Sequence, residues 1–216
     1  FNIFINDTYA ALSAADSALV LVDGVAGVEV QTEKVWEFAA KYNLPAAFII
    51  NKLDRERASF ERVLENIHEN FGRTAVPIQL PIGAERDFQG VIDLVHMKAY
   101  TYEPGGDGKG KAQDIPDNLS AAAQKAHEAL VEMVAEGNDA LMEEFFDKGS
   151  LTPEQMLEGL KLAVRERRLF PVMCAAALHN IGSDLIMDFV VDNFLAPVDR
   201  PPVKGKMGDQ ETERPI

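Results

Sequence analysis

Short apolar runs alternate with amphipathic stretches along the first third of the chain. The runs at 18–22 and 46–50 are continuously apolar and predict buried strands. Apolar residues recur at helical spacing over 59–71, and Gly72 ends that pattern. The other helices predicted in this part span 4–15 and 32–43. Alternating strands and helices predict a parallel sheet that is covered by helices on both faces.

The hydrophobic pattern changes from about residue 75. Two stretches, 76–80 and 91–102, predict strands, and Pro and Gly residues lie between them. Two helices are then predicted over 119–147 and 153–167, and Gly137-Asn138 is a point where the first helix can bend or break. This middle part therefore predicts an α+β unit.

The last part of the chain returns to the first pattern. Residues 170–174 predict another buried strand, and residues 181–195 predict the final helix, which Ala196-Pro197 ends. The residues that follow are rich in Pro, Gly and charge, and they predict a linker.

The tetrapeptide Asn51-Lys52-Leu53-Asp54 directly follows the second predicted strand. An Asn-Lys-x-Asp sequence in this place is how GTPases read guanine, because the Asp carboxylate accepts hydrogen bonds from the N1–H and 2-amino groups, which adenine does not offer there. The Asn amide can bond the other edge of the base, and the Lys stem can lie over its flat face. Ligands of open α/β sheets bind at the carboxyl ends of the strands, where this tetrapeptide falls. The alternative is a polar loop that enters a helix, with Asp54 bonding the free amides of that helix.

Further motifs accompany the tetrapeptide in a fixed order. They are Asp23-Gly24-Val25-Ala26-Gly27-Val28 with Gln31-Thr32, Leu80-Pro81-Ile82-Gly83-Ala84-Glu85, Gly90-Val91-Ile92-Asp93-Leu94, and Pro171-Val172-Met173-Cys174-Ala175-Ala176-Ala177 with Asn180 and Gly182. In order and spacing, this set resembles the G domain of bacterial translation elongation factor G over nearly the whole chain.

The resemblance implies an α/β fold of the phosphate-loop NTPase type, present in part. This fold is a mostly parallel sheet with helices on both faces and an inserted α+β subdomain. The implied division of the chain is a base-reading GTPase part at 1–74 and 170–196, the inserted subdomain at 75–169, and a linker toward a following domain at 197–216.

The resemblance also implies which residues bind the base. Asn51 and Asp54 select guanine, Lys52 covers the ring, and the loop at Ala176 and Ala177 presents a backbone N–H to guanine O6. The family often has a serine where Ala176 stands, and a tight loop of small residues without a ligand is the alternative. Leu178 either covers the base or is a core residue. The implied ligands are GTP and GDP, with Mg²⁺ in the intact protein.

A phosphate loop of the form G-x-x-x-x-G-K-[ST] does not occur in the 216 residues. We therefore expect the chain to hold the base-reading part of a GTPase without its phosphate-handling part. An ungapped count places Phe1 where the family has a His that positions the attacking water. A one-residue insertion near Asn2 would shift that register, so no catalytic residue is assigned.

Composition and charge indicate which partners, compartments and metal sites to expect for this chain. The formal net charge is −14, and such a surface repels phosphate backbones over about a Debye length, ~8 Å at physiological salt. Apolar stretches stay far shorter than the ~20 residues that cross a bilayer, so no membrane association is expected. A single cysteine, Cys174, excludes an internal disulfide and fits a cytoplasmic protein. The four His residues lack the spacing of metal ligands, so no metal site is predicted.

Acidic residues recur every three or four positions in the middle part. If this segment is helical, they form one acidic stripe opposite the apolar one: Glu128, Glu132, Glu136, Asp139, Glu143 and Asp147. A solvated helix face is the ordinary interpretation of such a pattern. The resemblance implies a second one, since the family's inserted subdomain is the contact surface for the ribosomal stalk protein.

The sequence thus favours an elongation-factor-G-like translational GTPase, which acts on the ribosome as a monomer. Two alternatives stay open. One is a noncatalytic module that binds a ribosomal protein through its acidic surface. The other is a GTP-binding paralogue without translocase activity.

Overall fold

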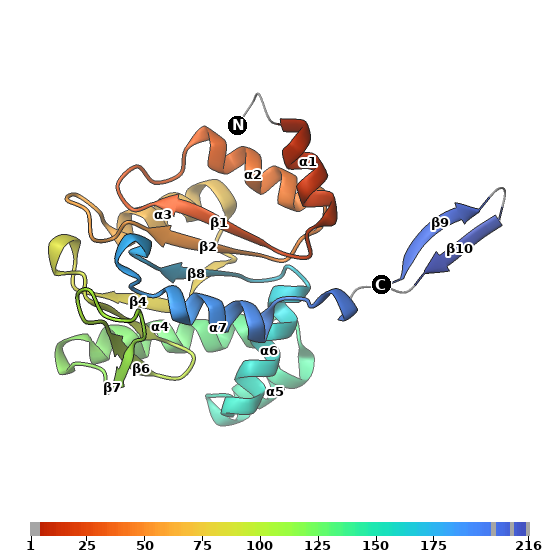
Figure 1. Cartoon of the computed structure of the whole chain (residues 1–216). Helices are drawn as coiled ribbons and strands as arrows, with labels where there is room; N and C mark the ends of the chain where they lie inside the picture. Colours follow the sequence, from red (N-terminus) through yellow and green to blue (C-terminus); the bar gives the residue numbers. More distant parts are fainter. Residues whose placement is uncertain (1–4, 200–201, 208–209, 215–216) are drawn as a thin grey trace.

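The computed structural model describes residues 5–199, 202–207 and 210–214 (Figure 1). Its centre is a parallel sheet with the strand order β1-β2-β8-β3. These strands are β1 (Ala18–Asp23), β2 (Ala46–Asn51), β8 (Phe170–Cys174) and β3 (Ala75–Pro77). Each neighbouring pair is parallel, so the carboxyl ends of the strands lie along one side of the sheet. The predicted α/β class is confirmed.

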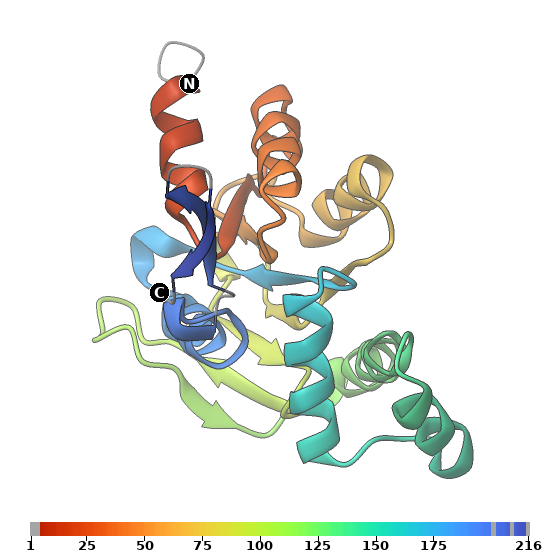
Figure 2. The ribbon, with the colours of Figure 1, turned by 90° about the vertical axis from the view of Figure 1, so that its right-hand side faces the viewer.

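Helices cover both faces of this sheet (Figures 1 and 2). They are α1 (Ile5–Ala14), α2 (Val30–Lys41) and α3 (Phe60–Phe71) on one side and α7 (Ser183–Asn193) on the other. Phe48 and Ile50 of β2 belong to the core that includes α2 and α3, whereas Ala47 and Ile49 belong to the second core. Successive strand residues point to opposite faces, so the apolar run at 46–50 is the sequence of a strand buried on both sides.

The middle part of the chain forms a second, antiparallel sheet with three helices. Its strand order is β4-β5-β6-β7. The strands are β4 (Gln79–Ile82), β5 (Gly90–Asp93), β6 (Lys98–Thr101) and β7 (Lys111–Gln113), and the helices are α4 (Asp117–Ala135), α5 (Asp139–Lys148) and α6 (Pro153–Arg165).

The single strand predicted over 76–80 is wrong, because the chain changes sheets within it. Residues 75–77 pair with β8, whereas residues 79–82 pair with β5. Ile78 lies between them and bonds in both directions: its N–H donates to the Val172 carbonyl (3.1 Å), and its carbonyl accepts from the Leu94 N–H (3.0 Å). The start of the inserted subdomain at residue 75 stays a prediction. The strand that begins there, β3, belongs to the parallel sheet and not to the second sheet.

The long strand predicted over 91–102 is a hairpin, β5 and β6, with antiparallel pairing. Asp93 causes the reversal. Its Oδ1 accepts hydrogen bonds from the backbone N–H groups of Val95 (2.8 Å) and His96 (3.1 Å), which closes a turn, and Met97 has a φ of 52°. The apolar residues of the turn continue the apolar run of β5 in the sequence. The hydrophobic pattern therefore does not show where β5 ends.

The predicted helix 119–147 is two helices, α4 and α5. Gly137 has a φ of 81°, and the Asn138 side chain accepts from the Leu141 N–H (3.2 Å), which starts α5. The acidic stripe is therefore not continuous: Glu128 and Glu132 lie on α4, and Asp139 and Glu143 lie on α5. All six acidic side chains of the predicted stripe are exposed.

The segment predicted as a linker contains regular structure. After a short helix, η4 (Pro197–Asp199), the chain forms an antiparallel hairpin of β9 (Val203–Met207) and β10 (Gln210–Arg214). Figure 1 shows this hairpin apart from the two sheets. Phe1, which the ungapped count placed at the catalytic position, lies outside the described residues.

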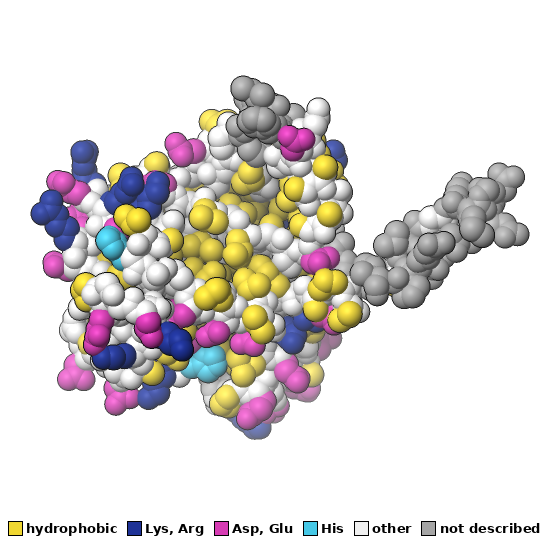
Figure 3. All heavy atoms as spheres, in the orientation of Figure 1, with side chains coloured by type: hydrophobic (Ala, Val, Ile, Leu, Met, Phe, Trp, Pro, Cys, Tyr) yellow, Lys and Arg dark blue, Asp and Glu magenta, His cyan; other side chains and the backbone are white. Residues whose placement is uncertain are grey.

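One face of the molecule is conspicuously apolar (Figure 3). β1 is an edge strand, and its residues Leu19 and Leu21 are 38% and 60% exposed. Met187 and Val191 of α7 are also exposed large apolar residues. Leu19 and Leu21 lie on the same face of the sheet as Ala47 and Ile49. At the edge strand β1, this face therefore carries uncovered apolar surface, although parallel sheets are normally covered on both faces. Within the described part of the chain, no helix is both long and apolar enough to cross a membrane.

Candidate guanine-base site

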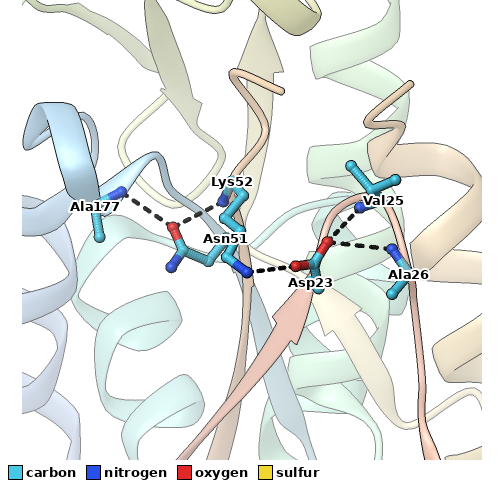
Figure 4. A network of polar contacts seen from close by, with 6 residues as sticks. All are labelled: Asp23, Val25, Ala26, Asn51, Lys52 and Ala177. Carbon is cyan, nitrogen blue, oxygen red and sulfur yellow. Dashed lines mark hydrogen bonds and ion pairs between the residues drawn. The ribbon is translucent and has the colours of Figure 1, made fainter. Parts of the chain in front are cut away.

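Three strand ends meet at the carboxyl side of the parallel sheet. Asp23 at the end of β1 lies beside Asn51 at the end of β2, and Ile50 of β2 lies beside Cys174 at the end of β8. The loops that follow these strands therefore converge, although they are far apart in the sequence. Figure 4 shows the polar contacts that join them.

Asn51 links the tetrapeptide to the loop after β8. Its side-chain Oδ1 accepts hydrogen bonds from the backbone N–H groups of Lys52 (2.8 Å) and Ala177 (3.0 Å). Two backbone bonds support this contact, from the Ala175 N–H to the Ile50 carbonyl (2.9 Å) and from the Leu53 N–H to the Ala175 carbonyl (3.3 Å). The structure thus brings together the two segments that were predicted to form one site. The prediction assigned a backbone N–H of the loop at Ala176 and Ala177 to guanine O6, and in the structure the Ala177 N–H donates to Asn51.

Lys52 reaches back to the end of β1. Its backbone has a φ of 65°, and its Nζ lies 2.6 Å from Asp23 Oδ2. The other carboxylate oxygen of Asp23 accepts from the backbone N–H groups of Val25 (2.8 Å) and Ala26 (3.2 Å). Burial disfavours the charged form of Asp23, but the hydrogen bonds from Lys52 and from these two amides outweigh it and lower the pKa of Asp23 to about 2.

Asp54 lies at the border between the loop after β2 and the second sheet. Its side chain is 21% exposed, and its Oδ2 lies 3.4 Å from Nε2 of His179. Asp54 and His179 line a cleft of about 650 Å³, whose other lining residues are Arg86, Asp87, Phe88, Gln89, Tyr102, Glu103, Pro104 and Ile181. The carboxylate is therefore next to a space that a planar ligand can enter. The sequence prediction gave His179 no role, because no neighbouring residue in the sequence indicates that it lies beside Asp54.

The loop after β8 is a tight structure with one exposed apolar residue. Ala176 is buried and exchanges two backbone hydrogen bonds with Ile181, at 3.1 and 3.2 Å. A short helix, η3 (Ala177–His179), follows it. Leu178 on this helix is 86% exposed, which excludes the interpretation of Leu178 as a core residue.

The comparisons with known proteins agree with this geometry. Residues 2–196 match the family described as the elongation factor Tu GTP binding domain. The chain belongs to this family. It is thus a domain of the translational GTPase family, and the three converging loops are part of that GTP binding domain.

A solved relative supports the same assignment. A crystal structure of a protein from Thermus thermophilus superposes on this GTP binding domain with a TM-score of 0.84 at 29% sequence identity. The match covers 94% of this chain and 30% of the other chain. The chain therefore spans about a third of the length of that relative.

Two residues of this GTP binding domain hold the loop after β1, and the sequence prediction gave neither a role. Arg62 on α3 donates through Nη2 to the carbonyl oxygens of Gly24 (3.2 Å) and Val25 (2.8 Å). Asn66, one turn further along α3, accepts from the Val28 N–H (2.7 Å). Their spacing in the sequence indicates that both lie on one face of a helix. The sequence does not reveal which loop they contact.

Cys174 lies in the stretch 170–174 that was predicted to be a buried strand. It is fully buried at the end of β8, and burial raises the pKa of its thiol well above the usual range. Among the residues that the structure describes, no group of three or more His, Cys, Asp or Glu side chains is placed to hold a metal ion.

Proposed function

We propose that this chain is the base-reading part of an elongation-factor-G-like translational GTPase. The observation that carries the proposal is the contact between Asn51 Oδ1 and the Ala177 N–H, which joins the Asn-Lys-x-Asp tetrapeptide to the loop after β8 beside the Asp54 carboxylate. In the intact GTPase, by which we mean the longer protein that carries this chain, this site binds the guanine of GTP and GDP.

The chemistry of the site suits guanine better than adenine. The two oxygens of the Asp54 carboxylate accept hydrogen bonds from guanine N1–H and from the 2-amino group, and adenine has neither donor there. The Lys52 stem lies along the face of the ring, and Leu178, which is exposed, covers the base from the other loop. The Ala177 N–H, which lies at the junction of both loops, is shared between Asn51 and guanine O6.

Phosphate binding requires residues other than those of this chain. Phosphates bind at glycine-rich backbone amides, a lysine and Mg²⁺, and the sequence contains no G-x-x-x-x-G-K-[ST] motif. No step of hydrolysis is assigned to the residues of this chain. We propose that the phosphate-binding segment of the intact GTPase covers the exposed apolar surface at Leu19 and Leu21.

The test compares base selectivity with phosphate-dependent affinity in the 216-residue chain. Calorimetry is expected to show no tight binding of GTP or GDP, because only base contacts are available. At millimolar ligand, GMP is expected to shift the backbone amide NMR signals of residues 51–54 and 175–178, and AMP is not. Equal shifts with both nucleotides contradict guanine reading. Submicromolar GDP affinity contradicts the proposed division between base and phosphate binding.

A second proposed function is contact with the ribosomal stalk protein. The exposed acidic side chains on α4, at its C-cap Glu136 and on α5 support it, because a surface of one charge accelerates association with a basic partner. The charge reversals Glu132→Lys, Glu136→Lys and Glu143→Lys together are expected to slow association with the C-terminal domain of the stalk protein. Raised salt should slow the unmodified protein in the same direction.

The matched control reverses three other exposed glutamates, Glu33, Glu37 and Glu69, on α2 and α3. It changes the net charge equally but on other helices. If both triple variants associate with the stalk domain at the same rate, the acidic residues of α4 and α5 are a solvated surface without this role.

A further inference from the structure

Asp23 and Lys52 connect two loops that the chain separates by 29 positions. Lys52 Nζ and Asp23 Oδ2 lie 2.6 Å apart, and the Lys52 side chain is 42% exposed while that of Asp23 is 21% exposed. A lysine stem has four rotatable bonds, so an exposed lysine ordinarily samples many conformations. The contact with Asp23 restricts this one to conformations that point toward the end of β1.

Asp23 is itself held firmly. The pairing of β1 with β2 sets it beside Asn51, and its second oxygen accepts from the amides of Val25 and Ala26. The next residue, Gly24, donates its N–H to the Asn51 carbonyl (2.7 Å). A Cβ at Gly24 would lie 3.0 Å from that same oxygen, so the two loops are in close backbone contact. The carboxylate therefore has a fixed position relative to the base-reading tetrapeptide.

We infer that Asp23 is a positioning residue for guanine binding: it holds the Lys52 ammonium so that the lysine stem lies along the face of the base. This inference rests on the proposed function of the tetrapeptide. Asp23 does not touch the base, and it acts through Lys52. The low pKa of Asp23 keeps this anchor ionised throughout the neutral range.

The substitution Asp23→Asn removes the charge and keeps the shape. The Asn oxygen can still accept from Val25 and Ala26, so the turn after β1 is retained. In the intact GTPase, we expect Asp23→Asn to weaken GDP binding on the order of tenfold, which corresponds to the loss of one charge-assisted contact. The preference for GDP over XDP should not change, because the lysine contacts the ring face and Asp54 reads the edge.

Lys52→Ala and the double variant Asp23→Asn/Lys52→Ala complete a double-mutant cycle. If Asp23 acts through Lys52, adding Asp23→Asn to Lys52→Ala lowers the GDP affinity no further. The chain supplies a matched control in Asp93. Its Oδ1 accepts from the amides two and three residues later, at 2.8 and 3.1 Å, and its Oδ2 pairs with His96 at 2.7 Å, but it lies in the second sheet. Asp93→Asn makes the same change of charge in a matching turn and should leave the GDP affinity unchanged.

Two outcomes overturn the inference. GDP affinity that is unchanged in Asp23→Asn shows that the ion pair only stabilises the fold. An equal loss of affinity in the presence and absence of Lys52 shows that Asp23 acts by another route. Failure of the proposed function is a different result, since the unmodified intact GTPase would then show no preference for guanine over adenine nucleotides.

Discussion

Replacing Asp54 by Asn is expected to lower the GDP affinity of the intact GTPase by roughly 10²–10⁴-fold. The carboxylate accepts two charge-assisted hydrogen bonds from guanine, each worth ~1.5–3 kcal/mol. The Asn side chain loses the charge and turns an NH₂ group toward the donors of the base. Titration of labelled GDP against both proteins measures the change.

Xanthine nucleotides identify the cause of this loss. Xanthine carries an oxygen where guanine has its 2-amino group, so XDP can accept a hydrogen bond from the new Asn amide and should partly restore binding. Asp87→Asn is the control, because Asp87 lines the same cleft and the substitution makes the same change of charge. Unchanged GDP affinity in Asp54→Asn would remove the assignment of Asp54 as the residue that reads the base.

The second large effect is on stability, at Gly182 after β8. Gly182 has φ 80° and ψ −4°, a left-handed conformation, and a Cβ added there would lie 2.5 Å from the carbonyl oxygen of Cys174. Left-handed backbone costs an L-residue about 1–2 kcal/mol, and an overpacked contact adds about 1–3 kcal/mol. Gly182→Ala should therefore lower the free energy of unfolding of the 216-residue chain by about 3 kcal/mol, measured by urea denaturation.

Gly149 separates the two contributions. It ends α5 with nearly the same backbone conformation, φ 73° and ψ 3°, and a Cβ there would meet no atom within 4 Å. Gly149→Ala should cost only the conformational part, about 1–2 kcal/mol. Equal losses at both positions would show that the loop after β8 moves away from the contact at no cost. In that case, the loop that carries Ala176 and Ala177 is not held rigidly by its own turn.

Apolar runs in the sequence predicted strands correctly where the whole run lies in one strand of one sheet. The runs at 18–22 and 46–50 predicted β1 and β2 to within one residue. β2 is buried on both faces and leaves no polar alternation, and β1 leaves none either, because the residues of its less covered face, Leu19 and Leu21, are apolar although they are exposed. The helix α3 was equally clear, since Phe60, Val63 and Ile67 all face one core and Gly72 ends the helix.

The hydrophobic pattern predicted strands wrongly where one apolar run contributes to two sheets or to both strands of a hairpin. Residues 76–80 contribute to both sheets, and residues 91–102 reverse direction at the Asp93 turn. An apolar residue has the same identity in either sheet, so periodicity cannot show where the chain crosses from one to the other. The bend between α4 and α5 was visible as Gly137-Asn138, but the stability of a break there depends on packing that the local sequence does not contain.

The sequence by itself determined the parallel sheet, the place of Asn51 to Asp54 at a strand end, and the resemblance that led to the GTP binding domain family. These properties follow from local composition and from motifs of adjacent residues. Only the tertiary structure decided that Asn51 bonds Ala177, that Lys52 pairs with Asp23, and that His179 lies beside Asp54. Each of these contacts joins loops from different strands, and their meeting point is set by strand order and register, which arise from packing over the whole sheet.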